Sequence, residues 1–212
     1  MVKLSSSPEV NLFCKQSIIM ELTKEYWNNR YKKLETGWDV GGITQPLKKY
    51  FDQVSNKKIK ILIPGSGNCH EAEYLFNNNF CNTYILDYSQ KAISNFIQRV
   101  PVFPKDQIVN MNFFDFNGKF DIVVEQTFFC AIDIKKRSEY VSKVSDLLKQ
   151  GGKLVGLFFE DQFNNDHPPF GGTKDEYIEL FRAYFDIKTI EICYNSEDAR
   201  MGRELFFILI KK

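Results

Sequence analysis

A short apolar strand, a glycine turn and a helix start follow one another at residues 58–71, and this stretch constrains the fold more than any other feature. Residues 58–63 are rich in Ile and end at Pro64, which indicates a buried parallel strand. Gly65 and Gly67 lack a Cβ, so the backbone can adopt positive φ and a ligand can lie against it. The following helix start directs free N–H groups at that ligand. The stretch therefore predicts a cofactor cradle in an α/β fold.

The third position of the glycine pattern helps to identify the cofactor. Dinucleotide-binding turns read G-x-G-x-x-G, but His70 stands here in place of the last glycine. This change favours S-adenosylmethionine over NAD and speaks against an NAD oxidoreductase. Asp87 lies about twenty residues after Gly67, at the end of the next predicted strand, where a carboxylate can accept from both ribose hydroxyls. The alternative is an ordinary turn with a helix-capping aspartate, which the joint occurrence of both signals disfavours.

Composition narrows the class of protein and its partners. With 212 residues and 43% hydrophobic residues, we expect one domain spanning 1–212. The net charge of +1 gives no electrostatic reason to expect a nucleic-acid or membrane partner. Five cysteines without a C-x-x-C pair, and no long apolar run, indicate a cytoplasmic protein with reduced thiols. We expect a small-molecule acceptor and favour a monomer.

A metal site is not expected. His70 and Glu71 begin the zinc-protease pattern H-E-x-x-H, but position 74 is Tyr, so the second histidine is missing.

Strand-like and helix-like segments alternate along the rest of the chain. Residues 1–19 read as a flexible or loosely docked end, and 20–55 as a helical cap over the cofactor site. Strands are predicted at 58–63, 82–86, 107–111, 120–125, 153–159, 187–194 and 204–210, and the later helices at 89–99, 135–150 and 173–184. Glycines 151 and 152 are expected to end the helix over 135–150. The pattern predicts a Rossmann-like, mostly parallel sheet with helices on both faces and a C-terminal antiparallel hairpin.

Several motifs together resemble one family, the thiopurine S-methyltransferases, and especially its thiol and halide methyltransferase branch. The matching stretches are residues 26–31 with 37–39, 63–67, 120–132, 168–172 and 202–207. The tryptophans of the first stretch and the run Phe128-Phe129-Cys130-Ala131 are the most specific. The resemblance implies the seven-stranded class I fold of S-adenosylmethionine-dependent methyltransferases, with that molecule as cofactor.

The resemblance also implies roles for particular residues. Those expected to bind the cofactor are Trp27, Tyr31 and Trp38 at the methionine end, Gly65, Gly67 and Asp87 at the turn and ribose, Asn112 and Phe113 at the adenine, and Gln126 nearby. Tyr31 stands where the branch often has Trp, and Asn112 where the family usually has Asp. Asp115 therefore competes with Asn112 for the adenine amino group.

Methyl transfer from a sulfonium needs positioning more than acid–base chemistry. Aromatic faces stabilise the cation by ~0.5–2 kcal/mol, and a thiol with a pKa near ~8.5 needs no strong base. The candidate acceptor wall consists of Phe128, Phe129, Pro168, Pro169 and Phe170. For the two adjacent phenylalanines, burial in the core is an equally good interpretation. No catalytic residue is assigned, because His167 reads as a solvated loop histidine and Cys130 as an inert thiol.

These observations predict an S-adenosylmethionine-dependent methyltransferase that acts on a small sulfur nucleophile (a thiol, a thiopurine or hydrosulfide), with halide as a second acceptor. The alternatives are an N- or O-methyltransferase of a small metabolite and a non-catalytic S-adenosylmethionine-binding module.

Overall fold

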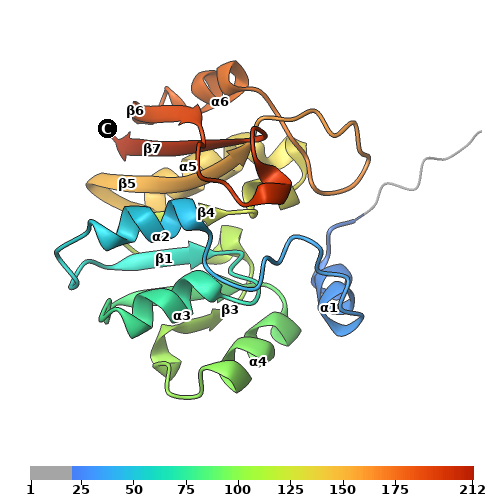
Figure 1. The fold of residues 1–212 in the computed structure, drawn as a ribbon, viewed down its shortest axis with the longest axis vertical. Coiled ribbons are helices and arrows are strands. Elements are labelled where there is room, and N and C mark those ends of the chain that lie inside the picture. The colour runs from blue at the N-terminus through green and yellow to red at the C-terminus, as the bar shows by residue number, and fades with distance from the viewer. Residues whose placement is uncertain (1–20) are drawn as a thin grey trace, which may run out of the picture.

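The computed structural model describes residues 21–212, which form a seven-stranded sheet with helices packed on its two faces (Figure 1). The predictions for residues 1–19 lie outside this range. The helices are α1 (Lys24–Lys32), α2 (Gln45–Asp52), α3 (His70–Asn77), α4 (Gln90–Arg99), α5 (Arg137–Leu147) and α6 (Lys174–Phe181). The strands are β1 (Ile61–Pro64), β2 (Thr83–Asp87), β3 (Ile108–Asn110), β4 (Phe120–Gln126), β5 (Leu148–Phe159), β6 (Phe185–Ile192) and β7 (Glu204–Lys211).

The sheet order β3-β2-β1-β4-β5-β7-β6 places the chain reversal between β1 and β4. Strands β1 to β5 pair in parallel, whereas β7 runs antiparallel to both β5 and β6. The predicted fold class is therefore confirmed, including the C-terminal antiparallel pair. In open α/β sheets, ligands bind beyond the carboxyl ends of the strands at such a reversal point.

Two apolar clusters cover the sheet, one on each face. One contains Tyr140 of α5 and Phe181 of α6, and the other contains Phe51 of α2, Leu75 of α3 and Phe96 of α4. Helix α1 belongs to neither cluster. It lies beside the carboxyl edge of the sheet, near α4 (Figure 1), because its one buried residue, Tyr31, faces the glycine turn rather than the sheet.

The boundary between α5 and β5 differs from the sequence prediction. Helix α5 ends at Leu147, and β5 begins at Leu148 and runs through both glycines. Leu148 is completely buried and pairs with Phe120 of β4. Burial of this leucine in the sheet ends the helix before the glycines are reached, so the prediction of a helix to residue 150 was wrong.

Candidate active site

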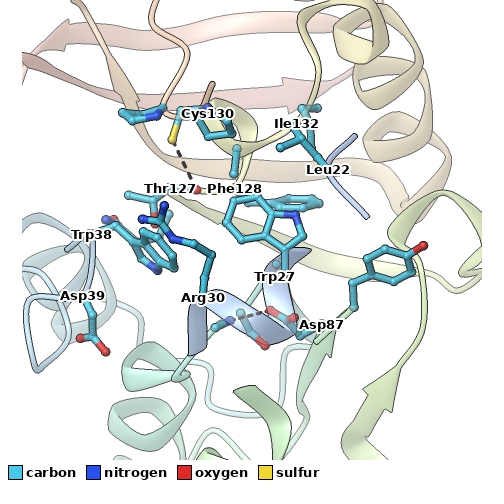
Figure 2. Close-up of a pocket in the computed structure, with 18 of the residues that line it drawn as sticks. Leu22, Trp27, Arg30, Trp38, Asp39, Asp87, Thr127, Phe128, Cys130 and Ile132 are labelled. Carbon is cyan, nitrogen blue, oxygen red and sulfur yellow. Dashed lines mark hydrogen bonds between the residues drawn. The ribbon is translucent and has the colours of Figure 1, made fainter. Parts of the chain in front are cut away.

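A cavity of about 940 Å³ opens at the carboxyl ends of β1, β2 and β4. Its walls come from α1 and the loop after it, the β1–α3 turn, the turn after β4, and two later segments near residues 159–169 and 199–203. Figure 2 shows that residues from distant parts of the chain, including Trp27, Asp87 and Phe128, meet around this space.

The glycine turn forms the floor of the cavity. Gly65 and Gly67 both have φ of +56°. A Cβ on Gly65 would lie 2.1 Å from the Phe128 ring, and a Cβ on Gly67 would lie 2.6 Å from the Tyr31 hydroxyl. A side chain at either position would collide with these groups, so the two glycines let Phe128 and Tyr31 pack directly against the backbone of the turn.

Asp87 connects this turn to the end of β2. Its carboxylate accepts hydrogen bonds from the backbone N–H of Gly67 at 2.7 Å and of Ser89 at 2.6 Å. The residue is only 7% exposed but lines the cavity, and burial raises the pKa of its carboxyl to about 6. The geometry therefore fits a ribose ligand, and Asp87 in addition fixes the turn.

The raised pKa of Asp87 predicts a pH dependence of cofactor binding. Below pH 6 the carboxyl becomes protonated and accepts hydrogen bonds less well, so affinity should fall up to about tenfold per pH unit and be level above pH 6. Folding stability changes in the opposite sense, decreasing as pH rises from about 4 to about 6. Titration calorimetry between pH 5 and 8 measures the affinity at each pH. We expect Asp87→Asn to abolish the change in pH dependence near pH 6. A change retained in that variant would contradict this.

Three aromatic rings lie beside the glycine turn. The ring centroid of Trp38 is 5.8 Å from those of Trp27 and Tyr31, in edge-to-face arrangements. The Arg30 guanidinium lies 5.3 Å from the centroid of Trp38. All of these residues line the cavity. The rings therefore form an aromatic wall in which Trp38 already holds the Arg30 cation by a cation–π contact.

The loop carrying Trp38 is attached on two sides. The Asp39 carboxylate is hydrogen-bonded to the His70 ring at 2.8 Å and also accepts from the Asn68 side chain. On the other side, the Arg200 guanidinium donates to the Trp38 carbonyl at 2.5 Å. His70 at the third glycine position thus ties the helix start to this loop, and bonding to His70 holds the pKa of Asp39 well below its usual range.

At the predicted adenine end, Asn112 and Phe113 line the cavity, whereas Asp115 is exposed and outside the lining. The side-chain oxygen of Asn112 accepts from the backbone N–H of Phe114 at 3.1 Å. Of these two candidates, only Asn112 lies at the cavity, and its side-chain oxygen is already engaged. Gln126 also lines the cavity, where its side-chain oxygen accepts from the Thr44 hydroxyl at 3.4 Å.

The candidate acceptor wall is only partly at the cavity. Phe128, Pro168 and Pro169 line it. Phe129 does not, because its ring is 1% exposed and packs in the core beneath, against aromatic rings of α5, β5 and α6. Phe170 is also outside the lining, although its backbone N–H donates to the Cys130 carbonyl at 2.7 Å. For both residues the acceptor-wall assignment is therefore corrected.

Cys130 lines the cavity, but its burial favours the protonated thiol. Burial raises the pKa of its thiol to about 12, and the thiol donates to the Thr127 carbonyl at 3.4 Å (Figure 2). Because the thiolate is the reactive form, we expect iodoacetamide at pH 8 to alkylate exposed Cys81 at least about tenfold faster than Cys130. Peptide mapping by mass spectrometry measures both rates, and equal labelling would contradict the assignment.

Three further residues at or near the cavity were not predicted from the sequence. The position of Asp39 could have been found, since it follows Trp38 in a matching motif. Nothing in the sequence indicated its hydrogen bond to His70. Arg200 is 7% exposed and reaches the site from a segment with no recognisable pattern. Glu125 is completely buried at the end of β4, and its position in the strand gave no indication of its contacts.

Within residues 21–212, no cluster of His, Cys, Asp and Glu side chains could hold a metal ion. The helices of this part of the chain are all too short or too polar to cross a membrane.

The sheet order, the glycine turn and the buried acidic residue at the end of β2 define a class I S-adenosylmethionine-dependent methyltransferase. Among solved structures, a 1,6-didemethyltoxoflavin-N1-methyltransferase from Burkholderia thailandensis, with bound S-adenosylhomocysteine, superposes with a TM-score of 0.72 at 15% identity, covering 89% of this chain and 87% of that one. The family model described as Thiopurine S-methyltransferase matches residues 22–202, and the chain belongs to this family.

Curated relatives agree with the family assignment. A probable thiol methyltransferase 2 of Arabidopsis thaliana is 25% identical over 159 residues, covering 73% of this chain and 70% of the relative. A thiocyanate methyltransferase 1 of Brassica oleracea is 25% identical over 186 residues, covering 84% and 81%. The predictions of the family, of a methyltransferase and of S-adenosylmethionine as its cofactor are confirmed.

Proposed function

We propose that this enzyme transfers the methyl group of S-adenosylmethionine to a small sulfur nucleophile. The observation that carries the proposal is the single cavity that reaches from the glycine turn to the apolar wall of Phe128, Pro168 and Pro169. Cofactor and acceptor can therefore occupy one continuous space. The names of the relatives, which include thiol and thiocyanate methyltransferases, support sulfur as the acceptor atom.

We assign the cofactor-binding roles to residues whose environment fits them. Asp87 would hold the ribose, and Asn112, Phe113 and Gln126 would line the adenosine end. Gly65 and Gly67 would allow the backbone to approach the ligand. The rings of Trp27, Tyr31 and Trp38 would surround the sulfonium. When bound, S-adenosylmethionine supplies an electrophilic methyl carbon, and attraction of its cation to each ring is worth ~0.5–2 kcal/mol.

The site needs no general base for a thiol. The carboxylates of Asp39 and Asp87 already accept hydrogen bonds from neighbouring groups. His167 lies exposed at the cavity, with its ring hydrogen-bonded to the Pro168 carbonyl. A thiol with a pKa near ~8.5 is a few per cent thiolate at neutral pH and attacks in that form. The enzyme then contributes position, which supplies up to roughly 7–11 kcal/mol in favourable cases.

A panel of acceptors tests the proposal. Turnover of methyl-labelled S-adenosylmethionine is measured with thiophenol, a thiopurine, hydrosulfide and iodide, and with a catechol and an amine. We expect product with the sulfur acceptors and, more slowly, with iodide. Product with only the catechol or the amine would contradict sulfur as the acceptor atom.

We also propose that the chain acts as a single-domain monomer in the cytoplasm, without a nucleic-acid partner. The described cysteines Cys69, Cys81, Cys130 and Cys193 are free thiols, as expected in a reducing compartment. Light scattering during size-exclusion chromatography should give the monomer mass of 24.8 kDa. A mass twice as large would contradict the monomer.

A further inference from the structure

A buried carboxylate holds the turn that follows β4. Glu125 is completely buried, and one of its carboxylate oxygens accepts from the backbone N–H groups of Phe128 and Phe129, both at 2.8 Å. The other oxygen accepts from the Tyr140 hydroxyl of α5 at 2.6 Å. Three donors therefore converge on one carboxylate, which ties the turn after β4 to helix α5.

The backbone of this turn is strained. Thr127 has φ of +55°, a left-handed conformation that β-branched residues rarely adopt. Such outliers persist only where neighbouring interactions impose them. The hydrogen bonds that the backbone N–H groups of the two residues after Thr127 donate to Glu125 provide that restraint.

The strained turn brings Phe128 onto the cofactor cradle. The Phe128 ring covers Gly65 so closely that a Cβ there would lie 2.1 Å from it. It also packs edge-to-face against Phe113, with 5.2 Å between ring centroids. Phe128 thus bridges the glycine turn and the predicted adenine end, and its place depends on the backbone that Glu125 holds.

The neighbouring strand packs closely against the backbone of Glu125. A Cβ on Gly156 of β5 would lie 2.0 Å from the Glu125 carbonyl and 2.6 Å from its Cβ. Glu125 itself does not line the cavity, and its carboxylate oxygens already accept three hydrogen bonds. It is therefore unsuited to act as a base on the acceptor.

We propose that Glu125 is a positioning residue, whose carboxylate holds the Thr127 turn so that Phe128 closes the cofactor site over Gly65. The inference rests on the cofactor assignment above but not on the identity of the acceptor. Burial raises the pKa of the Glu125 carboxyl to about 7, whereas the bonds from Tyr140 and the two N–H groups lower it. An amide at this position can still accept both N–H groups through its carbonyl oxygen, so charge is not required for the restraint.

The test compares Glu125→Leu with Glu125→Gln by titration calorimetry with S-adenosylhomocysteine, together with thermal unfolding. We expect the leucine variant to lose at least about tenfold in affinity and the glutamine variant to stay within about threefold of the wild type. Leu209→Ala, in the core of β7 outside the cavity, is the control for destabilisation and should lower Tm without changing affinity.

A second variant keeps the test decisive if Glu125→Leu does not fold. Glycine adopts positive φ without strain, so Glu125→Leu with Thr127→Gly should fold and recover part of the lost affinity. Wild-type affinity in Glu125→Leu, equal losses in the leucine and glutamine variants, or failure of the Thr127→Gly rescue would each overturn the proposal. Loss of activity toward sulfur acceptors with normal cofactor affinity would instead count against the proposed acceptor.

Discussion

Replacing Asp87 with Ala should weaken S-adenosylmethionine binding about 100-fold. Hydrogen bonds to a charged acceptor contribute about 1.5–3 kcal/mol each, and the variant loses those to the ribose hydroxyls. It also releases the backbone N–H groups of Gly67 and Ser89, which the carboxylate now holds at 2.7 and 2.6 Å. Titration calorimetry at pH 7.5 measures the change in Kd.

Asp115→Ala is the matched control for this substitution. Asp115 is an exposed carboxylate outside the cavity, so its removal should leave affinity within about twofold of the wild type. An unchanged Kd in Asp87→Ala would remove Asp87 from the site. A large loss in Asp115→Ala would restore that residue as the partner of the adenine.

Gly67→Ala should also reduce cofactor binding, by about 100-fold or more. The added methyl would lie 2.6 Å from the Tyr31 hydroxyl. The alanine would also have to adopt φ of +56°, a left-handed conformation that L-residues other than glycine rarely adopt. The conformational cost alone is about 1 kcal/mol, and displacement of the buried Tyr31 ring disrupts the aromatic cluster around it. Equilibrium dialysis with labelled S-adenosylmethionine measures the loss.

Two comparisons separate the steric effect from the backbone effect. Gly151→Ala imposes the same kind of strain, at φ of +71°, but in open space on β5, so it should cost stability and spare binding. Adding Tyr31→Phe to Gly67→Ala removes the clashing oxygen and leaves the next atom 3.7 Å away, so part of the affinity should return. Loss of binding in Gly151→Ala, or no recovery in the double variant, would contradict this account.

Much of the fold could be predicted from the sequence because local signals and tertiary packing agree. The buried β1 run and the helices expected from about Ser89 and about Thr173 all form, and the structure shows a serine cap at the start of α4 and a threonine–glutamate capping box at the start of α6. The prediction failed at Leu148, where burial in the sheet overrode the helical pattern. The residues around Leu148 do not indicate that it will pair with Phe120 of β4, which is distant in the sequence.

Parts of the candidate site could be predicted where the backbone geometry requires a particular residue type or spacing in the sequence. The positive φ at Gly65 and Gly67 requires glycine, and the spacing from Gly67 to Asp87 is typical of a ribose-binding acid. By contrast, Phe128 and Phe129 are identical neighbours, yet a strained turn sends one ring to the cavity and the other into the core. The hydrogen bonds of Glu125 and the approach of Arg200 depend on residues distant in the chain, so pattern analysis could not detect them.

A single-turnover experiment most directly tests whether this enzyme transfers the methyl group of S-adenosylmethionine to sulfur. Enzyme in excess over methyl-labelled S-adenosylmethionine is mixed with thiophenol, and both products are followed by rapid quench and chromatography. We expect labelled methyl phenyl sulfide and S-adenosylhomocysteine to appear in equal amounts and at the same rate, and Asp87→Ala to slow both together at subsaturating cofactor. Binding of the cofactor without transfer of the label to thiophenol or to any other sulfur acceptor would contradict this expectation.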